Sequence, residues 1–259
     1  MTGRTRALLA ITALSVAAAL LAPGVPQPPG YHDFADHRSL LGVANAPDVL
    51  SNGAFLLAGL AGLWIALRPR TSFDHAGERI PYAVFFAGVL LTALGSGYYH
   101  LAPDNERLFW DRLPMTIAFM ALLAAQVGDR VDARAGRTLL LPMLAIGAAS
   151  VVYWRATERA GAGNVVPYGV LQAYSVVILL LIALWLPSRY TRGGDVYAVF
   201  ACYVVAKLVE TFDAPLYALG HVVSGHTLKH LAAAAGAFLV CRMLALREPA
   251  VPPPGRSLG

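Results

Sequence analysis

Long apolar runs alternate with short polar connections along most of the chain. Seven such runs cover approximately residues 49–68, 80–100, 112–127, 138–154, 166–186, 196–213 and 226–246. Each can supply the roughly 20 apolar residues that an α-helix needs to cross a hydrocarbon layer about 30 Å thick. The pattern therefore predicts an all-α fold, a polytopic transmembrane helix bundle with a seven-helix core.

An eighth apolar run, from Arg6 to Ala22, precedes the others and is followed by a Pro- and Gly-rich stretch, Pro23 to Gly30. It is either a cleaved signal peptide or a retained signal anchor. We favour a retained helix, because no clean small-x-small cleavage site stands out among the alanines. The expected organisation is an N-terminal segment and linker over 1–30, a seven-transmembrane domain over 31–247, and a disordered, Pro-rich tail over 248–259.

Composition agrees with a membrane protein, since 57% of the residues are hydrophobic and only 14% are charged, against about a quarter in soluble domains. The two cysteines, Cys202 and Cys241, lie inside apolar runs, which argues against a disulfide framework or a cysteine zinc site. The high Ala and Arg content and the short loops favour a bacterial plasma membrane.

The arginines predict the orientation of the bundle. With the N-terminus in the cytoplasm, thirteen arginines fall on the cytoplasmic side and five outside, as the positive-inside rule requires. This topology places the C-terminus in the cytoplasm. It also explains the net charge of +5, so we expect no nucleic-acid partner.

Histidines at helical spacing are the main candidates for chemistry. His226 and His230 are four residues apart, as two imidazoles must be to bind one metal ion from one helix. His100 ends the second core run, after Ser96, and Asp111 lies at the mouth of the third. The predicted topology brings all these groups to one depth, near the outer leaflet.

A single histidine at a membrane interface is usually a hydrogen-bonded residue, so this prediction depends on the combination. Three neutral imidazoles with an open fourth position are typical of catalytic zinc. Ionisable groups inside a membrane are costly and indicate function. The sequence therefore predicts a zinc site with a carboxylate beside it.

The combined motif resembles the alkaline ceramidases, which belong to a superfamily of seven-helix membrane hydrolases that includes the progestin and adipoQ receptors. The resemblance consists of S-x-x-x-H at Ser96 and His100, Asp111 in "WDRLPM", and H-x-x-x-H at His226 and His230, and it extends over about residues 31–246. It implies zinc bound by the three histidines and a role for Ser96 and Asp111 in amide hydrolysis. The implied substrate is a membrane lipid, ceramide or a related N-acyl lipid.

Two acidic features allow more than one interpretation. "DFAD", with Asp33 and Asp36, resembles the start of the calcium-binding segment of alkaline ceramidases, although the later ligands do not match. A solvated acidic loop that caps the site is the alternative to Ca²⁺.

The sixth core run carries Lys207 and Glu210, which we expect to form an ion pair. The alternative is that Glu210 or Asp213 orients a ligand imidazole. Lys229 has two candidate partners, a lipid headgroup and Asp213. His221 is close enough in sequence to compete with His226 as a ligand.

Two further functions remain open at this point. A receptor-like or regulatory protein with a structural zinc would bind metal without turnover. A transporter would use intramembrane charges as a proton or metal path, and would need them in both leaflets, whereas most of those found here cluster near one face.

Overall fold

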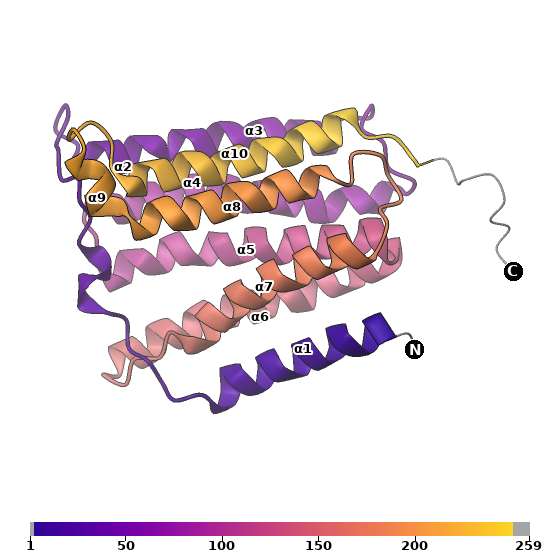
Figure 1. Cartoon of the computed structure of the whole chain (residues 1–259), viewed down its shortest axis with the longest axis horizontal. Helices are drawn as coiled ribbons and strands as arrows, with labels where there is room; N and C mark the ends of the chain where they lie inside the picture. The colour runs from indigo at the N-terminus through magenta and orange to yellow at the C-terminus, as the bar shows by residue number, and fades with distance from the viewer. Residues whose placement is uncertain (1–2, 251–259) are drawn as a thin grey trace, which may run out of the picture.

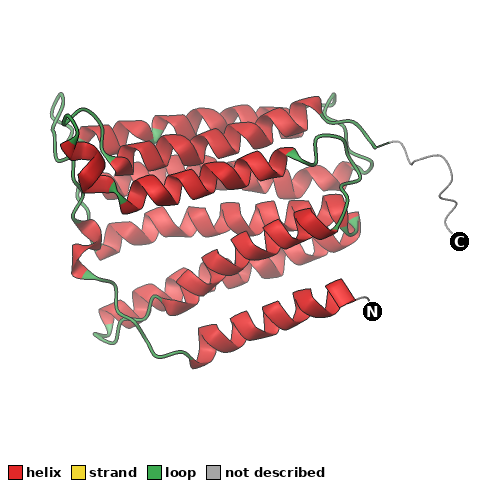
Figure 2. Ribbon diagram, viewed as in Figure 1, coloured by secondary structure: helices red, strands yellow, loops and turns green. Residues whose placement is uncertain are grey.

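A computed structural model describes residues 3–250, and these form an all-α bundle without β-strands (Figures 1 and 2). The long helices are α1 (Gly3–Leu21), α3 (Gly53–Leu67), α4 (Arg79–Leu101), α5 (Asn105–Arg130), α6 (Ala133–Arg159), α7 (Val166–Trp185), α8 (Asp195–Thr211) and α10 (Gly225–Leu246). Short helical elements lie toward the bundle ends: η1 (Pro29–His32), α2 (Ala46–Ser51), η2 (Ala76–Glu78) and α9 (Asp213–Ala218). Of the tail predicted to be disordered over 248–259, residues 251–259 lie outside the described part of the chain, whereas Glu248 and Ala250 form backbone hydrogen bonds with Thr191 and Arg189.

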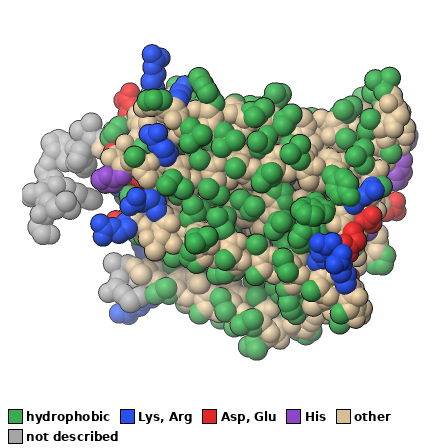
Figure 3. Space-filling view, turned by 180° about the vertical axis from the view of Figure 1, so that it is seen from behind, with side chains coloured by type: hydrophobic (Ala, Val, Ile, Leu, Met, Phe, Trp, Pro, Cys, Tyr) green, Lys and Arg blue, Asp and Glu red, His purple; other side chains and the backbone are tan. Residues whose placement is uncertain are grey.

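Seven helical stretches among the described residues are long and apolar enough to cross a membrane: Gly3–Leu21, Ala46–Leu67, Ala76–Leu101, Asn105–Arg130, Ala133–Arg159, Val166–Trp185 and Gly225–Leu246. Charged side chains gather at the two ends of the bundle, and hydrophobic side chains cover the band between them (Figure 3). Both features are those of a multi-pass membrane protein.

The sixth predicted run differs from the others. It forms α8, which has 17 residues and is shorter than the roughly 20 residues of a typical spanning helix. α8 nevertheless lies in the bundle beside α10 (Figure 1). It also carries the Lys207–Glu210 pair, so its apolar stretch is interrupted near one end.

Two helices begin earlier and end later than the apolar runs that predicted them. α5 and α6 begin after Asp104 and Asp132, whose carboxylates accept hydrogen bonds from the backbone N–H groups of Arg107 and Ala135. Such N-caps extend a helix into polar sequence, where an apolar run gives no signal. Asp111 consequently lies in the second turn of α5 rather than at its start.

Small residues allow the central helices to approach closely, as is common in membrane bundles. A Cβ added to Gly95 of α4 would lie 1.9 Å from the carbonyl oxygen of Trp110 in α5, and one added to Gly136 of α6 would lie 2.6 Å from that of Ala124. Backbone contact between α4 and α5 therefore fixes the spacing of the two helices that carry His100 and Asp111.

The N-terminal helix α1 lies at the edge of the bundle and packs on α7 (Figure 1). Thr12 hydrogen-bonds the hydroxyl of Tyr174 at 3.0 Å, and Arg4 donates to the carbonyl of Trp185 at 2.8 Å. No described residue of α1 is buried. Leu8 and Ile11 are partly buried against the hydrophobic core, so α1 contributes to the packing only at its periphery.

A buried polar network ties the helices together at the end that is opposite to the histidines. The Asp129 carboxylate accepts hydrogen bonds from Tyr82 at 2.6 Å and from Arg247 at 2.9 Å. The Arg247 guanidinium also lies over the rings of Tyr190 and Phe73. These contacts join the end of α10 to α4 and α5, so the charges at this end have a structural role.

Candidate metal centre

Three buried imidazoles meet at one end of the bundle, as the sequence predicted. His100 comes from the last turn of α4, and His226 and His230 come from the first two turns of α10. One ring nitrogen of each lies within 4.8 Å of the others, and the Nε2 atoms of His100 and His226 are 3.2 Å apart. No other group of three His, Cys, Asp or Glu side chains this close occurs among residues 3–250.

The spacing of these nitrogens fits a transition-metal ion. Tetrahedral zinc with Zn–N bonds of about 2.0–2.1 Å separates its nitrogen ligands by roughly 3.3 Å, close to the distance between His100 and His226. His100 and His226 are both buried, with exposed fractions of 1% and 5%. The chain therefore offers a three-histidine site, which suits Zn²⁺ among several first-row metals.

The start of α10 is held by contacts from three directions. Ser224 caps the helix by accepting a hydrogen bond from the backbone of Thr227. Gly225 lies so close to α8 that an added Cβ would be 2.0 Å from the carbonyl oxygen of Val209. Asp213 accepts hydrogen bonds from the backbone N–H of His226 at 2.7 Å and of Ala35 at 2.9 Å. Asp213 thus fixes the backbone at His226 and does not bond its ring.

The orientation of His230 is set by a serine that sequence analysis missed. The Ser51 hydroxyl lies 2.8 Å from Nδ1 of His230 and donates to the carbonyl oxygen of Asp48 at 2.9 Å. Because the serine proton is used in this way, its oxygen accepts from Nδ1–H, and Nε2 of His230 is left to bind metal. No local spacing relates Ser51 to a histidine 179 positions away, so the pair is visible only in the fold.

An aromatic ring covers two of the histidines. Phe34 belongs to the N-terminal loop, which we define as residues 31–45, and its ring centroid lies 4.8 Å from that of His100 and 4.3 Å from that of His226. No spacing or periodicity in the sequence predicts this contact, because Phe34 lies in a loop far from both histidines along the chain. The loop shields the metal centre from bulk solvent.

The two aspartates of this loop are not brought together. Asp36 is fully buried and forms a bidentate pair with Arg38, whereas the Asp33 side chain is 83% exposed. Burial alone would raise the pKa of Asp36, but the hydrogen bonds and charge of Arg38 outweigh burial and lower this pKa below its usual value. An arginine occupies the oxygens that Ca²⁺ would need, so the calcium prediction gains no support from this geometry.

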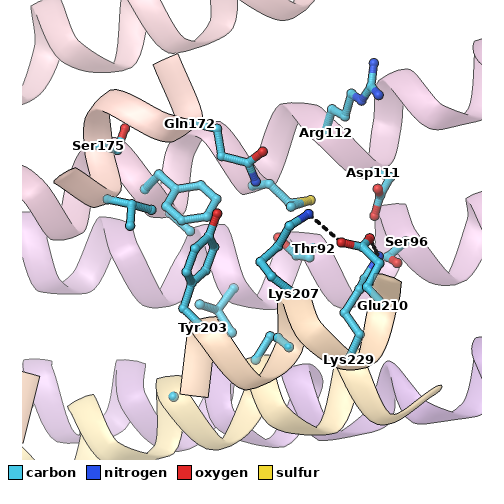
Figure 4. Close-up of a pocket in the computed structure, with 18 of the residues that line it drawn as sticks. Thr92, Ser96, Asp111, Arg112, Gln172, Ser175, Tyr203, Lys207, Glu210 and Lys229 are labelled. Atoms are coloured by element: carbon cyan, nitrogen blue, oxygen red, sulfur yellow. Dashed lines mark hydrogen bonds and ion pairs between the residues drawn. The ribbon is translucent and has the colours of Figure 1, made fainter. Parts of the chain in front are cut away.

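A cavity of about 510 Å³ extends from the metal centre into the bundle (Figure 4). His230, Ser96 and Asp111 line it, and Figure 4 shows Ser96 and Asp111 near each other in its wall. Further along, the walls are mainly apolar and come from α4, α5, α7, α8 and α10: Phe85, Val89, Phe119, Leu122, Leu179 and Val199. The predicted catalytic groups therefore stand at one end of a largely apolar chamber.

The structure also shows the contacts of the other polar residues considered from the sequence, Lys207, Lys229 and His221. Lys207 pairs with Glu210 as expected, and Lys229 donates to the same carboxylate at 2.8 Å instead of meeting Asp213. His221 is exposed and packs on the ring of Tyr217, so it does not compete with His226.

A scan against protein-family models and a search of curated proteins found no match. The functional interpretation therefore depends on the site itself.

Proposed function

We propose that this chain is an integral-membrane, zinc-dependent amidase that hydrolyses the N-acyl bond of ceramide or a related N-acyl lipid to a fatty acid and a long-chain amine. One observation supports the proposal above all. The buried side chains of His100, His226 and His230 lie close together, beside a cavity that Asp111 and Ser96 line. The resemblance to the alkaline ceramidases, set out from the same residues, points to the same chemistry.

Zinc held by three neutral imidazoles would act as a Lewis acid and lower the pKa of a bound water to about 7. Asp111 accepts a proton from the attacking water and returns it to the nitrogen of the leaving amine. Ser96 donates a hydrogen bond to the substrate carbonyl oxygen as negative charge develops there. The placement of Ser96 and Asp111 in the lining of one cavity (Figure 4) supports both roles, because one bound amide can reach the two groups.

The cavity suits an acyl chain. Its volume of about 510 Å³ falls within the roughly 300–1,000 Å³ of small-molecule sites, and its apolar walls match a hydrocarbon chain. The polar groups lie near one end of the bundle, where the scissile bond of a lipid meets its headgroup. We assign this end to the outer leaflet of the membrane from the arginine distribution.

A receptor-like protein with a structural zinc is the second candidate. The cover that Phe34 forms over two histidines favours it, because structural zinc sites are closed whereas catalytic sites keep an open position. His230 nevertheless lines the cavity together with Asp111, which gives a substrate access to the third histidine. Turnover separates the two candidates.

The first test removes one metal ligand and one catalytic group in separate variants. His226→Ala should lose both bound zinc and hydrolysis, because two imidazoles hold the ion poorly. Asp111→Ala should keep zinc and lose about 10²–10⁴-fold in turnover, the usual contribution of general acid–base catalysis. The measurements are metal content of the purified protein and release of fatty acid from N-acyl lipids.

His221→Ala is the matched control, since this exposed histidine lies five positions before His226. It should retain zinc and activity. Purified protein without stoichiometric zinc would contradict the proposal, and zinc without turnover on any N-acyl lipid would favour the receptor-like candidate.

A further inference from the structure

The polar end of the cavity carries more positive than negative charge. Three cationic side chains line it, Lys207, Lys229 and Arg112, together with two carboxylates, Glu210 and Asp111. The formal balance of these five groups is one positive charge. Bound zinc would add two more. An excess charge in a low-dielectric interior is costly unless a counter-ion is present.

The two lysines share a single carboxylate. Lys207 donates to Oε2 of Glu210 and Lys229 donates to Oε1, so both carboxylate oxygens are occupied. Each ammonium has three N–H donors, and among the described residues Glu210 is the hydrogen-bond partner of both. Figure 4 shows the three side chains converging in the cavity near Asp111 and Ser96. Both ammonium groups thus retain donors: that of Lys229 lies in the chamber, with a side chain 21% exposed, whereas the Lys207 side chain lines the same chamber and is 52% exposed.

The positive charge of Arg112 is not balanced by a carboxylate among the described residues. Its side chain is 3% exposed, and its Nη2 donates to the side-chain oxygen of Gln27 at 2.7 Å. Its Nε and Nη1 have no hydrogen-bond partner among the described residues. The guanidinium lies over the rings of Trp154 and Tyr168, at 4.4 and 4.7 Å from their centroids. Such contacts stabilise a cation without neutralising it.

We infer that the substrate supplies the missing negative charge: the cavity takes an N-acyl lipid whose amine portion carries an anionic group, a carboxylate or a phosphate, bound by the ammonium groups of Lys207 and Lys229. This inference rests on the proposed amidase function and narrows it. Neutral ceramide would leave the excess charge uncompensated. An anionic N-acyl lipid would place its acyl chain along the apolar walls, its amide at Asp111 and Ser96, and its charge on the lysines.

The test compares two amides that differ only in this charge. N-oleoylglycine and N-oleoylethanolamine share the acyl chain and the amide, and they end in a carboxylate and a hydroxyl, respectively. We expect kcat/KM to be at least about tenfold higher for N-oleoylglycine. An N-acyl phosphatidylethanolamine, tested beside them, distinguishes a phosphate from a carboxylate as the preferred anion.

Binding is measured separately from hydrolysis and without metal. In zinc-depleted protein in detergent, native mass spectrometry with equal amounts of the two oleoyl amides should show the anionic amide bound in excess. This arm matters because zinc itself attracts carboxylates. Preference that disappears when zinc is removed would assign the anion to the metal and overturn the inference.

Lys207→Gln should lower the preference at least fivefold while the zinc content stays stoichiometric, and Lys207→Arg should restore it. Arg107→Gln is the matched control, because Arg107 is a cation of α5 outside the cavity, and it should keep the wild-type preference. If a lysine variant fails to fold, the wild-type comparison of the two amides still decides.

The two proposals fail in different ways. Hydrolysis of both amides at equal rates, with equal binding, would refute the anion site and leave the amidase intact. Binding of N-oleoylglycine without cleavage of any amide would support the anion site and refute the amidase.

Discussion

The candidate metal centre depends on side chains other than its three histidines. Ser51 hydrogen-bonds Nδ1 of His230, and Asp213 accepts a hydrogen bond from the backbone N–H of His226. The ring of Phe34 packs on the rings of His100 and His226. Residues that hydrogen-bond a ligand imidazole fix its tautomer and direction, and their loss usually costs about 10–100-fold in metal affinity or activity. The role of these supporting residues can therefore be tested by substituting one of them while all three histidines are kept.

Ser51→Ala should weaken zinc binding by about 10–100-fold, because Nδ1 of His230 loses its acceptor and the ring loses its fixed orientation. Competition with a chromophoric chelator measures the dissociation constant directly. Ser150→Ala is the matched control, since Ser150 is also buried but bonds the carbonyl of Gly147 in its own helix. Equal zinc affinity in both variants would show that Ser51 does not position His230.

Sequence spacing predicted the ligands but not the residues that support them. His226 and His230 lie on one face of a helix, and the order of helices brings His100 to the same end, so both relations can be inferred from the chain. Ser51 and Phe34 reach the site through packing of α2 and the N-terminal loop, for which no periodic signal exists. Family resemblance suggested calcium at Asp33 and Asp36, whereas Arg38 pairs with one of these carboxylates.

At the scale of helices, the site requires that α4 and α5 touch. Hydrophobic periodicity located both helices, but it could not show that Gly95 faces the backbone of α5. Nor could it show how far the helices extend, because their capping residues, such as Asp104, lie in polar sequence. Close helix contact is a property of the pair, and a single run of sequence does not reveal it.

Gly95→Ala should destabilise the protein by about 1–3 kcal/mol or more, the usual cost of overpacking, because its Cβ would clash with the carbonyl oxygen of Trp110. Separation of α4 from α5 should also move Asp111 away from Ser96 and lower activity. Thermal unfolding in detergent and fatty acid release measure the two effects.

Gly97→Ala provides the control within the same helix, two residues further on. An added Cβ at Gly97 meets nothing within 4 Å, and alanine favours a helix over glycine by roughly 1 kcal/mol. This variant should be as stable as the wild type or more stable. Equal destabilisation by the two substitutions would mean that glycine flexibility, rather than helix contact, matters in α4.

At the scale of the whole molecule, the two ends of the bundle differ in character. The histidine end contains the metal centre and the polar end of the cavity, while the opposite end contains the Asp129–Arg247 network and the connections rich in arginine. The fold class and the grouping of charges at the ends were predictable from sequence, since both follow from apolar runs and loop composition. The cavity was not, because it results from the side chains of five helices.

The orientation of these ends in the membrane is open to direct measurement. Ala162→Cys and Ala76→Cys each introduce one exposed thiol, in the α6–α7 loop at the histidine end and in η2 at the opposite end, respectively. Both are made in a background where Cys202 and Cys241 are alanine. In intact bacterial cells, a membrane-impermeant maleimide should label only Ala162→Cys, because we expect the arginine-rich end to stay in the cytoplasm. Ala76→Cys should react only after permeabilisation, and the reverse pattern would place the metal centre at the inner leaflet and require a cytoplasmic source of substrate.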